Sequence, residues 1–337
     1  MRLIRHARRW GWRLRGGLSL VFISSISFAA AEIEGKPEKS EITIALPQLS
    51  GAPIPVFLAH ELGLFKKQGI NAKIQVLNSA VSVQAVVSGD ADVFAGGATL
   101  SNARLGGAPV KFFGATTQQY VFQMYGAKEI TNVQQLKGKT VAATTPRAAI
   151  ETVTREVLKK AGLTLNIDVK ILYLQTVPAM LTAIVSGTAS AGALSPPTTL
   201  KAREAGLNLI SDIGKLNVPG LQVGFGTTES FLKNNPNTAF AFLKAMASAA
   251  ALARKDPNIT KRVISTYLKI DDPKMVDETY EVFSPYWMTS LGVREEAIQA
   301  HLDSLEEKEF PNVKNVKAKD FIDNSLVDKL ARSGFVP

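Results

Sequence analysis

The chain contains 337 residues, of which 46% are hydrophobic and 20% are charged. This length allows two domains with cores of their own, and the balance is that of a globular protein, which excludes a disordered, fibrous or polytopic membrane chain. The formal net charge is +10, but six arginines lie among the first 15 residues, so the chain beyond residue 31 carries +10 − 6 = +4. The basic character therefore belongs mostly to the N-terminus, and we expect no nucleic-acid partner.

The N-terminus has the pattern of a secretory signal peptide. Its arginines precede an apolar run over 18–28, and Ala29-Ala30-Ala31 offers a cleavage site before Glu32. The alternative is an uncleaved membrane anchor, although the run is shorter than the roughly 20 apolar residues that cross a bilayer. We predict that 1–31 is a signal peptide cleaved near Ala31, with the Sec and twin-arginine export routes both open.

Cysteine is absent from the whole sequence. An exported protein of this size has enough core to fold without disulfides, and there is no cysteine after the apolar run that could accept a lipid anchor. We therefore expect a free, soluble, monomeric protein in a bacterial periplasm.

The sequence after the signal alternates between strand and helix patterns. A polar stretch over 34–40 leads into the first strand, and the Gly- and Pro-containing segment 47–53 predicts a loop. The next helix is expected to end at Gly69, and the following one at Ser88-Gly89. Strands are predicted at 41–46, 73–77, 91–95 and 110–113, and helices at 54–67, before Ser88, and at 99–105.

A second group of elements follows Leu136-Lys137-Gly138-Lys139 in the same order. Its strands are predicted at 140–143, 169–174, 189–194 and 207–210, and its helices at 148–160, 178–185 and 198–205. Ser88-Gly89 and Ser186-Gly187 lie 186 − 88 = 98 residues apart. One β-α-β-α-β-α-β unit therefore occurs twice, around 41–113 and 140–210. Such alternation predicts parallel sheets with right-handed crossovers, and hence an α/β protein with two lobes.

From residue 227 the sequence is mostly helical. A strand at 220–226 is expected to cross back to the first lobe, and the helices would cover the lobes. We predict that lobe 1 comprises 41–122 and 225–337, and that lobe 2 comprises 126–222. The helices are expected at 236–254, 257–268, 273–283, 294–306 and 325–332.

Four loops are candidates for a ligand site between the lobes. In open parallel sheets, ligands bind beyond the carboxyl ends of the strands, where loops lead into helix N-termini. The loops 48–52, 96–99, 144–147 and 195–198 are rich in Gly, Ser, Thr and Pro, which suit anionic or amide-like oxygens. The alternative is that they are only helix caps and turns. The candidate ligand-binding residues are Gln48, Ser50, Gly51, Gly96, Gly97, Ala98, Thr99, Gln123, Thr144, Thr145, Pro146, Arg147, Ser195 and Pro196.

Four of the larger side chains near these loops have two interpretations each. Arg147 could clamp an anionic ligand or be a solvated residue of the first helical turn. Gln123 and Tyr125, at the crossing out of lobe 1, could form the rim of the cleft or simply pack. Trp287 could be a platform for a ligand, although core packing is favoured.

Residues arranged for catalysis are not found. His60 and His301 have no metal-ligand spacing to another His or to Cys, so no metal is expected. Lys137-Gly138-Lys139-Thr140 resembles the end of a phosphate-binding loop, but Val133 stands where the upstream Gly is required. We therefore predict no enzyme activity, no catalytic residues and no cofactor.

Several of these segments together resemble the nitrate, taurine and alkanesulfonate class of substrate-binding proteins of ABC transporters, with relatives that bind thiamine-pyrimidine precursors. The resemblance spans roughly 41–250. The segments are Glu61-Leu62-Gly63-Leu64-Phe65-Lys66-Lys67-Gln68-Gly69-Ile70, Ser88-Gly89-Asp90-Ala91-Asp92, Leu136-Lys137-Gly138-Lys139-Thr140-Val141 and Ser195-Pro196-Pro197.

The resemblance implies a two-lobed periplasmic binding protein of type II, which closes on a small organic or anionic solute. Its implied partners are an inner-membrane permease and the permease's ATPase subunit. The implied ligand loops are Ser50-Gly51, 96–98, 144–146 and Ser195-Pro196. No His follows Thr144-Thr145, where the sulfonate and nitrate binders often carry a Ser/His pair, and this departure weakens a sulfonate assignment.

Two other classes of protein share this architecture. An exported enzyme acting on a small heterocyclic or acidic substrate would need a base and a nucleophile in the cleft, and the pyrimidine-forming enzymes of the superfamily carry a Cys-rich segment that is absent here. The ligand-sensing domain of a transcription factor would need a helix-turn-helix N-terminus. The identity of the solute stays open among sulfonates, nitrate, carboxylates and heterocycles.

Overall fold

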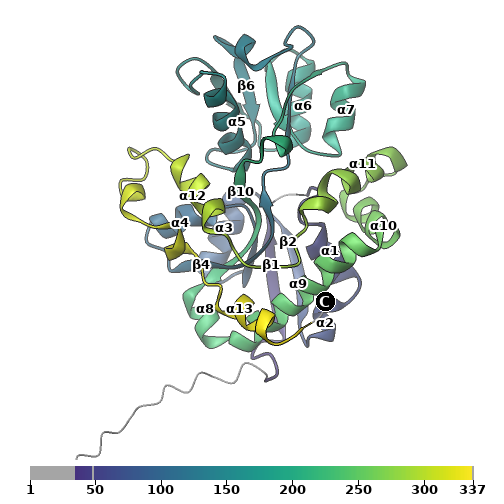
Figure 1. The fold of residues 1–337 in the computed structure, drawn as a ribbon, viewed down its shortest axis with the longest axis vertical. Coiled ribbons are helices and arrows are strands. Elements are labelled where there is room, and N and C mark those ends of the chain that lie inside the picture. Colours follow the sequence, from purple (N-terminus) through teal and green to yellow (C-terminus); the bar gives the residue numbers. More distant parts are fainter. Residues whose placement is uncertain (1–34, 48, 336–337) are drawn as a thin grey trace, which may run out of the picture. The chain divides into compact units, whose positions relative to one another are not determined.

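Two five-stranded β-sheets form the centres of two lobes in the computed structural model, which describes residues 35–47 and 49–335 (Figure 1). The predicted signal peptide and Gln48 lie outside the described residues. The sheet of lobe 1 has the order β2-β1-β3-β10-β4, and that of lobe 2 has the order β7-β6-β8-β5-β9. The strands of lobe 1 are β1 (Glu41–Leu46), β2 (Asn71–Val76), β3 (Val93–Gly96), β4 (Val110–Gln119) and β10 (Pro219–Thr228). Those of lobe 2 are β5 (Gln123–Gly126), β6 (Thr140–Ala143), β7 (Lys170–Tyr173), β8 (Ala191–Leu194) and β9 (Asn208–Asp212).

The duplicated unit predicted from the sequence is confirmed in the pairing of the strands. β1 pairs in parallel with β2 and β3, and β6 pairs in parallel with β7 and β8. One antiparallel strand enters each sheet beside this unit. In lobe 1 it is β10, which separates β3 from β4, and in lobe 2 it is β5, which separates β8 from β9. The sheets are therefore mainly parallel, as expected.

The two antiparallel strands lie at the connections between the lobes. β5 follows β4 directly along the chain, and β10 follows the short 3₁₀-helix η2 (Gly214–Leu216) that comes after β9. The expected crossing strand at 220–226 is therefore the central part of β10. β5 was not predicted, and the strand expected at 110–113 is longer because β4 pairs with β10 up to Gln119.

The helices of the duplicated units follow their strands as predicted, with one correction. The helix expected at 54–67 is two helices, because Gly63 adopts φ 63 and turns the chain between them. In lobe 1 the helices are α1 (Ile54–Glu61), α2 (Leu64–Lys67), α3 (Ser79–Ser88) and α4 (Leu100–Leu105). In lobe 2 they are the 3₁₀-helix η1 (Val133–Leu136) and the helices α5 (Ala149–Lys160), α6 (Val177–Val185) and α7 (Thr198–Glu204).

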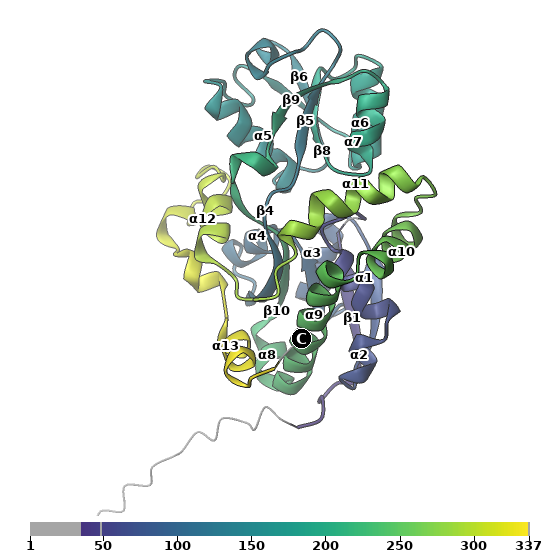
Figure 2. The ribbon, with the colours of Figure 1, turned by 45° about the vertical axis from the view of Figure 1, so that its right-hand side comes forward.

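The C-terminal helices pack mainly around lobe 1 (Figure 2). The long helix α9 packs on α1, α2 and α13, and α12 packs on β10. These elements are α8 (Glu229–Asn234), α9 (Pro236–Lys255), α10 (Pro257–Leu268), α11 (Pro273–Phe283), η3 (Ser284–Tyr286), α12 (Glu295–Asp303), η4 (Val313–Asn315), η5 (Ala318–Phe321) and α13 (Ser325–Arg332). None of the described helices is both long and apolar enough to cross a membrane.

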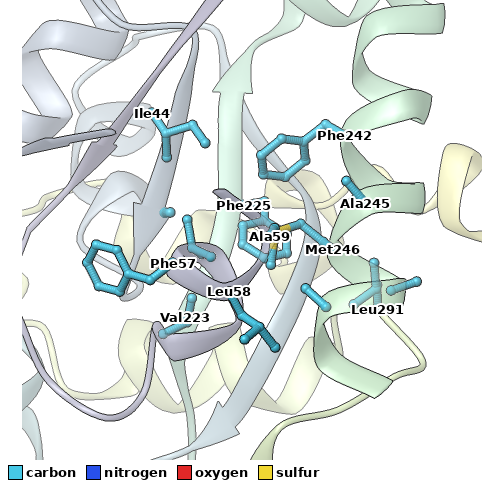
Figure 3. Close-up of a cluster of buried hydrophobic side chains, with 14 of the residues drawn as sticks. Ile44, Phe57, Leu58, Ala59, Val223, Phe225, Phe242, Ala245, Met246 and Leu291 are labelled. Atoms are coloured by element: carbon cyan, nitrogen blue, oxygen red, sulfur yellow. The ribbon is translucent and has the colours of Figure 1, made fainter. Parts of the chain in front are cut away.

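The core of lobe 1 is centred on an aromatic cluster between its sheet and α9. The Phe242 ring lies 5.1 Å from that of Phe225, 5.5 Å from that of Phe65 and 5.7 Å from that of Phe113, measured between centroids. Figure 3 shows Phe225 and Phe242 together with Phe57, Leu58 and Ala59 of α1, which belong to the same apolar cluster. A second group of apolar residues covers the other face of the same sheet, whereas lobe 2 has one core. Close-packed apolar side chains therefore hold the sheet of lobe 1 from both faces.

Candidate functional site

A cavity of about 570 Å³ lies between the carboxyl ends of the two sheets and is lined by residues of both lobes. Most of its wall comes from the loops that join strands to helices. Eight of the candidate residues line it: Ser50, Gly96, Gly97, Thr99, Thr144, Thr145, Ser195 and Pro196. The structure therefore brings together residues from all four predicted loops.

Five other candidate residues, all among those that the structure describes, lie outside the cavity lining. Gly51 is packed under Phe283, and its carbonyl accepts a hydrogen bond from the buried indole of Trp287 at 3.2 Å. Trp287 is thus a core residue of lobe 1. Gln123 accepts a hydrogen bond from the Tyr125 hydroxyl at 3.2 Å. Ala98, Pro146 and Arg147 also fall outside the lining, and Gln48 lies outside the described residues.

Arg147 is turned away from the cavity by its backbone. Its φ is 61, and its guanidinium lies 3.6 Å from Glu309 and 5.5 Å from the centroid of the Phe310 ring. Both partners belong to the C-terminal segment of lobe 1. The structure therefore places Arg147 in a contact between the lobes.

Two further ion pairs between the lobes also join an arginine of lobe 2 to a glutamate of lobe 1. Arg155 of α5 pairs with Glu306 at 3.3 Å, and Arg203 of α7 pairs with Glu278 of α11 at 2.5 Å. The hydrogen bond to Glu278 raises the pKa of Arg203. The three described ion pairs between the lobes thus each place an arginine on lobe 2 and a glutamate on lobe 1.

The strand ends place small residues where the chain approaches the cavity. A Cβ atom on Gly96 would lie 2.6 Å from side-chain atoms of both Pro47 and Phe94. A Cβ on Gly97 would lie 3.2 Å from the Leu221 carbonyl oxygen. Gly96 is therefore required by close packing of β3 against the loop after β1, whereas Gly97 makes the looser contact with β10.

A third pair of loops lines the cavity and was not predicted. It consists of 76–79 after β2 and 175–178 after β7. Asn78 and Thr176 cap the helices that follow by accepting hydrogen bonds from Val81 N and Ala179 N. These two caps lie 176 − 78 = 98 residues apart, the same offset as the two Ser-Gly pairs, so the repeat itself contained the signal.

Gln222 of β10 also lines the cavity and had no sequence signal. It is buried, and its side-chain oxygen accepts a hydrogen bond from Val121 N at 2.8 Å. Val121 lies just before β5, so this contact joins the two segments that connect the lobes.

The cavity wall is uncharged over the described residues. Its side chains are small, aliphatic, hydroxyl or amide groups, with no Asp, Glu, Lys, Arg or His among those that the structure describes. Four helices of eight or more residues, α1, α3, α5 and α6, begin at residues on or next to this wall. Each helix N-terminus carries a partial positive charge of about half an elementary charge. The cavity therefore favours atoms with lone pairs or negative charge.

The two histidines within the described residues serve other contacts. His60 lies 3.0 Å from the Tyr267 hydroxyl, and the buried His301 lies 2.9 Å from Asn102 Oδ1. Burial lowers the pKa of His301 to about 4, so it is neutral at physiological pH. Neither histidine lines the cavity. No group of three or more potential metal ligands occurs among 35–47 and 49–335.

Comparison with known proteins gives one sequence family and several similar structures. The sequence profile described as NMT1/THI5 like matches residues 52–259. Curated protein sequences yield no match.

Three solved structures illustrate the structural likeness. A protein of Bordetella bronchiseptica RB50 superposes with a TM-score of 0.76 at 20% identity, over 89% of this chain and 99% of the other. The alkanesulfonate-binding protein SsuA of Xanthomonas axonopodis pv. citri, bound to MOPS, superposes with a TM-score of 0.69 at 18% identity, over 85% of this chain and 98% of the other. The periplasmic nitrate-binding protein NrtA of Synechocystis PCC 6803 superposes with a TM-score of 0.70 at 16% identity, over 90% of this chain and 91% of the other. The likeness shows that this chain has the two-lobed fold of periplasmic binding proteins, which confirms the predicted fold class.

Proposed function

We propose that this chain, which belongs to the NMT1/THI5-like family, is the solute-binding component of an ABC importer. In this proposal it captures a small organic solute between its lobes in the periplasm, as a monomer, and delivers it to a membrane permease driven by an ATPase. The observation that carries the proposal is the cavity of about 570 Å³ between equivalent loops of a duplicated unit. Uncharged walls with helix N-termini suit reversible binding of a ligand rather than bond-making chemistry.

The size of the cavity favours an organic solute over a small inorganic anion. A cavity of about 570 Å³ falls within the range of about 300–1,000 Å³ that is typical of sites for small organic ligands. An anion of the size of nitrate would leave most of this space unfilled. A solute with an apolar body of several carbons fits the aliphatic wall better.

The ion pairs between the lobes suggest how binding would be coupled to closure. Movement about the two connections would bring Arg147, Arg155 and Arg203 toward their glutamates as the cavity closes. The permease would then recognise the closed, loaded form. We propose that 1–31 directs the chain to the periplasm and is removed there.

The proposal is tested by extracting the denatured protein for small molecules and by a thermal-shift screen. We expect mass spectrometry to find one solute that co-purifies, and we expect that solute to raise the melting temperature. A ligand at about 100 times its dissociation constant adds about 2.7 kcal/mol to the free energy of unfolding. If no small solute changes the melting temperature, or if the protein converts the solute into a product, the proposed function is wrong.

A further inference from the structure

Two buried polar groups at the cavity have no hydrogen-bond partner within the described residues. They are Oγ of Ser50 and Nε2 of Gln222, on residues that are 4% and 3% exposed. Both residues line the cavity, and both belong to lobe 1. In contrast, Asn78 and Thr176 on the same wall use their side chains as helix caps. The lobe 1 side of the wall thus holds polar atoms that no described residue satisfies.

The orientation of the Gln222 amide is fixed by its neighbour. Val121 N is a donor, so the atom 2.8 Å from it must be the amide oxygen of Gln222. The amide nitrogen is therefore the end without a partner. An amide NH₂ group offers two donors and no acceptor, so whatever completes its hydrogen bonding must supply a lone pair.

The surroundings favour the same chemistry. The helix N-termini at the cavity carry partial positive charge, and no carboxylate is found among the described lining residues. A cationic solute would therefore lose its hydration without gaining a counter-charge. A solute with an oxygen or nitrogen acceptor would satisfy the buried donor of Gln222 and the hydroxyl of Ser50.

We propose that Gln222 is a specificity-determining residue that donates a hydrogen bond from Nε2 to an acceptor atom of the solute. This inference rests on the proposed function. The solute then carries an acceptor, either a neutral carbonyl-type oxygen or an oxyanion, on an otherwise apolar body that faces Val76, Ile150 and Val177. Gln222 selects for that acceptor, and its position on β10 links recognition to the connection between the lobes.

The test uses three probes that share a six-carbon chain. N,N-Dimethylhexanamide is a neutral acceptor, hexanesulfonate is an anionic acceptor, and hexylammonium is a cationic donor. Gln222→Glu preserves the acceptor for Val121 N and replaces the donor at the cavity by an oxygen, and Gln222→Met removes the donor without adding charge. We expect at least one acceptor probe to bind the wild type and to lose about tenfold or more in affinity in both variants. Hexylammonium is expected to bind Gln222→Glu more tightly than wild type.

Gln118 provides a matched control, because it is a buried amide outside the cavity lining. Its Nε2 already donates to the Gly292 carbonyl at 2.7 Å. Gln118→Glu should lower the melting temperature without changing the order in which the probes bind. The relative affinities of the neutral and anionic acceptors show which kind of acceptor the cavity prefers.

Three results overturn the inference. The first is an acceptor probe that binds wild type and both Gln222 variants with equal affinity, which leaves the receptor function standing. The second is tighter binding of hexylammonium than of the acceptors to wild type. The third is that none of the three probes binds wild type, in which case the solute screen described above decides separately whether the receptor function also fails.

Discussion

The two walls of the cavity derive from the same structural unit but differ in how their polar groups are used. Asn78 and Thr176 are equivalent helix caps in the two lobes, but Ser195-Pro196-Pro197 of lobe 2 fills the position that Gly97-Ala98-Thr99 occupies in lobe 1. In lobe 1, close-packed Gly96 brings the backbone to the cavity, and Ser50 and Gln222 have polar atoms without a hydrogen-bond partner in the described part of the chain. The duplication thus accounts for the frame of the site, and the departures from it are where selectivity would arise.

The lobes also differ outside the cavity. Lobe 1 has separate apolar clusters on the two faces of its sheet and carries the C-terminal helices, whereas the apolar residues of lobe 2 form one cluster that includes both faces of its sheet. Lobe 2 supplies the arginines of the ion pairs between the lobes, and lobe 1 supplies the glutamates. Lobe 1 is accordingly the base, and lobe 2 is the part that docks on it.

The largest expected effect concerns the core of the base. Phe242→Ala removes the ring at the centre of the aromatic cluster and should lower the free energy of unfolding by about 3–5 kcal/mol. Denaturation with urea measures this loss, and hydrogen exchange locates it. Exchange should accelerate in β1, β3 and α9 and stay unchanged in β6 and β8. Equal acceleration in both sheets would contradict the independence of the two cores.

Acid should weaken lobe 1 through His301. Burial lowers the pKa of this residue to about 4, so the unfolded chain binds a proton near pH 6.5 that the folded chain does not. The contribution of neutral His301 to the free energy of unfolding is therefore fully present above pH 6.5. It decreases by about 3 kcal/mol as the pH falls toward 4. Unfolding of His301→Gln should show a weaker dependence on pH in this window. An identical dependence in wild type and variant would exclude His301 as its source.

The close packing of Gly96 predicts a smaller loss. Gly96→Ala places a Cβ 2.6 Å from Pro47 and Phe94 and should destabilise the protein by about 1–3 kcal/mol. Gly97→Ser, which copies the residue found at Ser195, is the control and should cost less, because its nearest contact is 3.2 Å away. Thermal unfolding of the two variants gives the comparison. Equal losses in the free energy of unfolding would mean that contact with Pro47 and Phe94 is not the reason for a glycine at position 96.

The smallest effect is expected for an ion pair between the lobes. Arg203→Met should lower the free energy of unfolding by about 1 kcal/mol or less, because the arginine is partly exposed. The substitution should also weaken solute binding a few fold, and high salt should abolish this difference in affinity between wild type and variant. Lys215→Met removes a pair that lies wholly within lobe 2 and should leave solute affinity unchanged. If both variants bind equally well, the pairs between the lobes do not assist closure.

Periodicity and turn residues were sufficient to predict most of the fold. The repeat at 98 residues identified both units, and the Gly- and Pro-rich loops indicated four segments that line the cavity. β5 was missed because Gln123-Met124-Tyr125-Gly126 is too short for a pattern of its own and becomes a strand by pairing with β8 and β9. The break at Gly63 was missed because the apolar spacing continues across it.

The site residues show a sharper limit. Loops at strand ends can be located from sequence, and the pair formed by 76–79 and 175–178 could have been found from the repeat offset. Arg147 could not be placed, because its direction depends on one positive φ and on Glu309, which is distant in sequence. Gln222 could not be found either, since its importance comes from a hydrogen bond to Val121 across the connection. The ligand-binding roles of these residues stay predictions.

The central claim, that the cavity between the lobes holds one organic solute, is tested most directly by native mass spectrometry of two matched variants. Ala149 and Ala161 are both partly buried alanines that pack on the core of lobe 2, but only Ala149 lines the cavity. Ala149→Phe should carry no solute, whereas wild type and Ala161→Phe should each carry one molecule per chain. Full occupancy of Ala149→Phe would contradict the account.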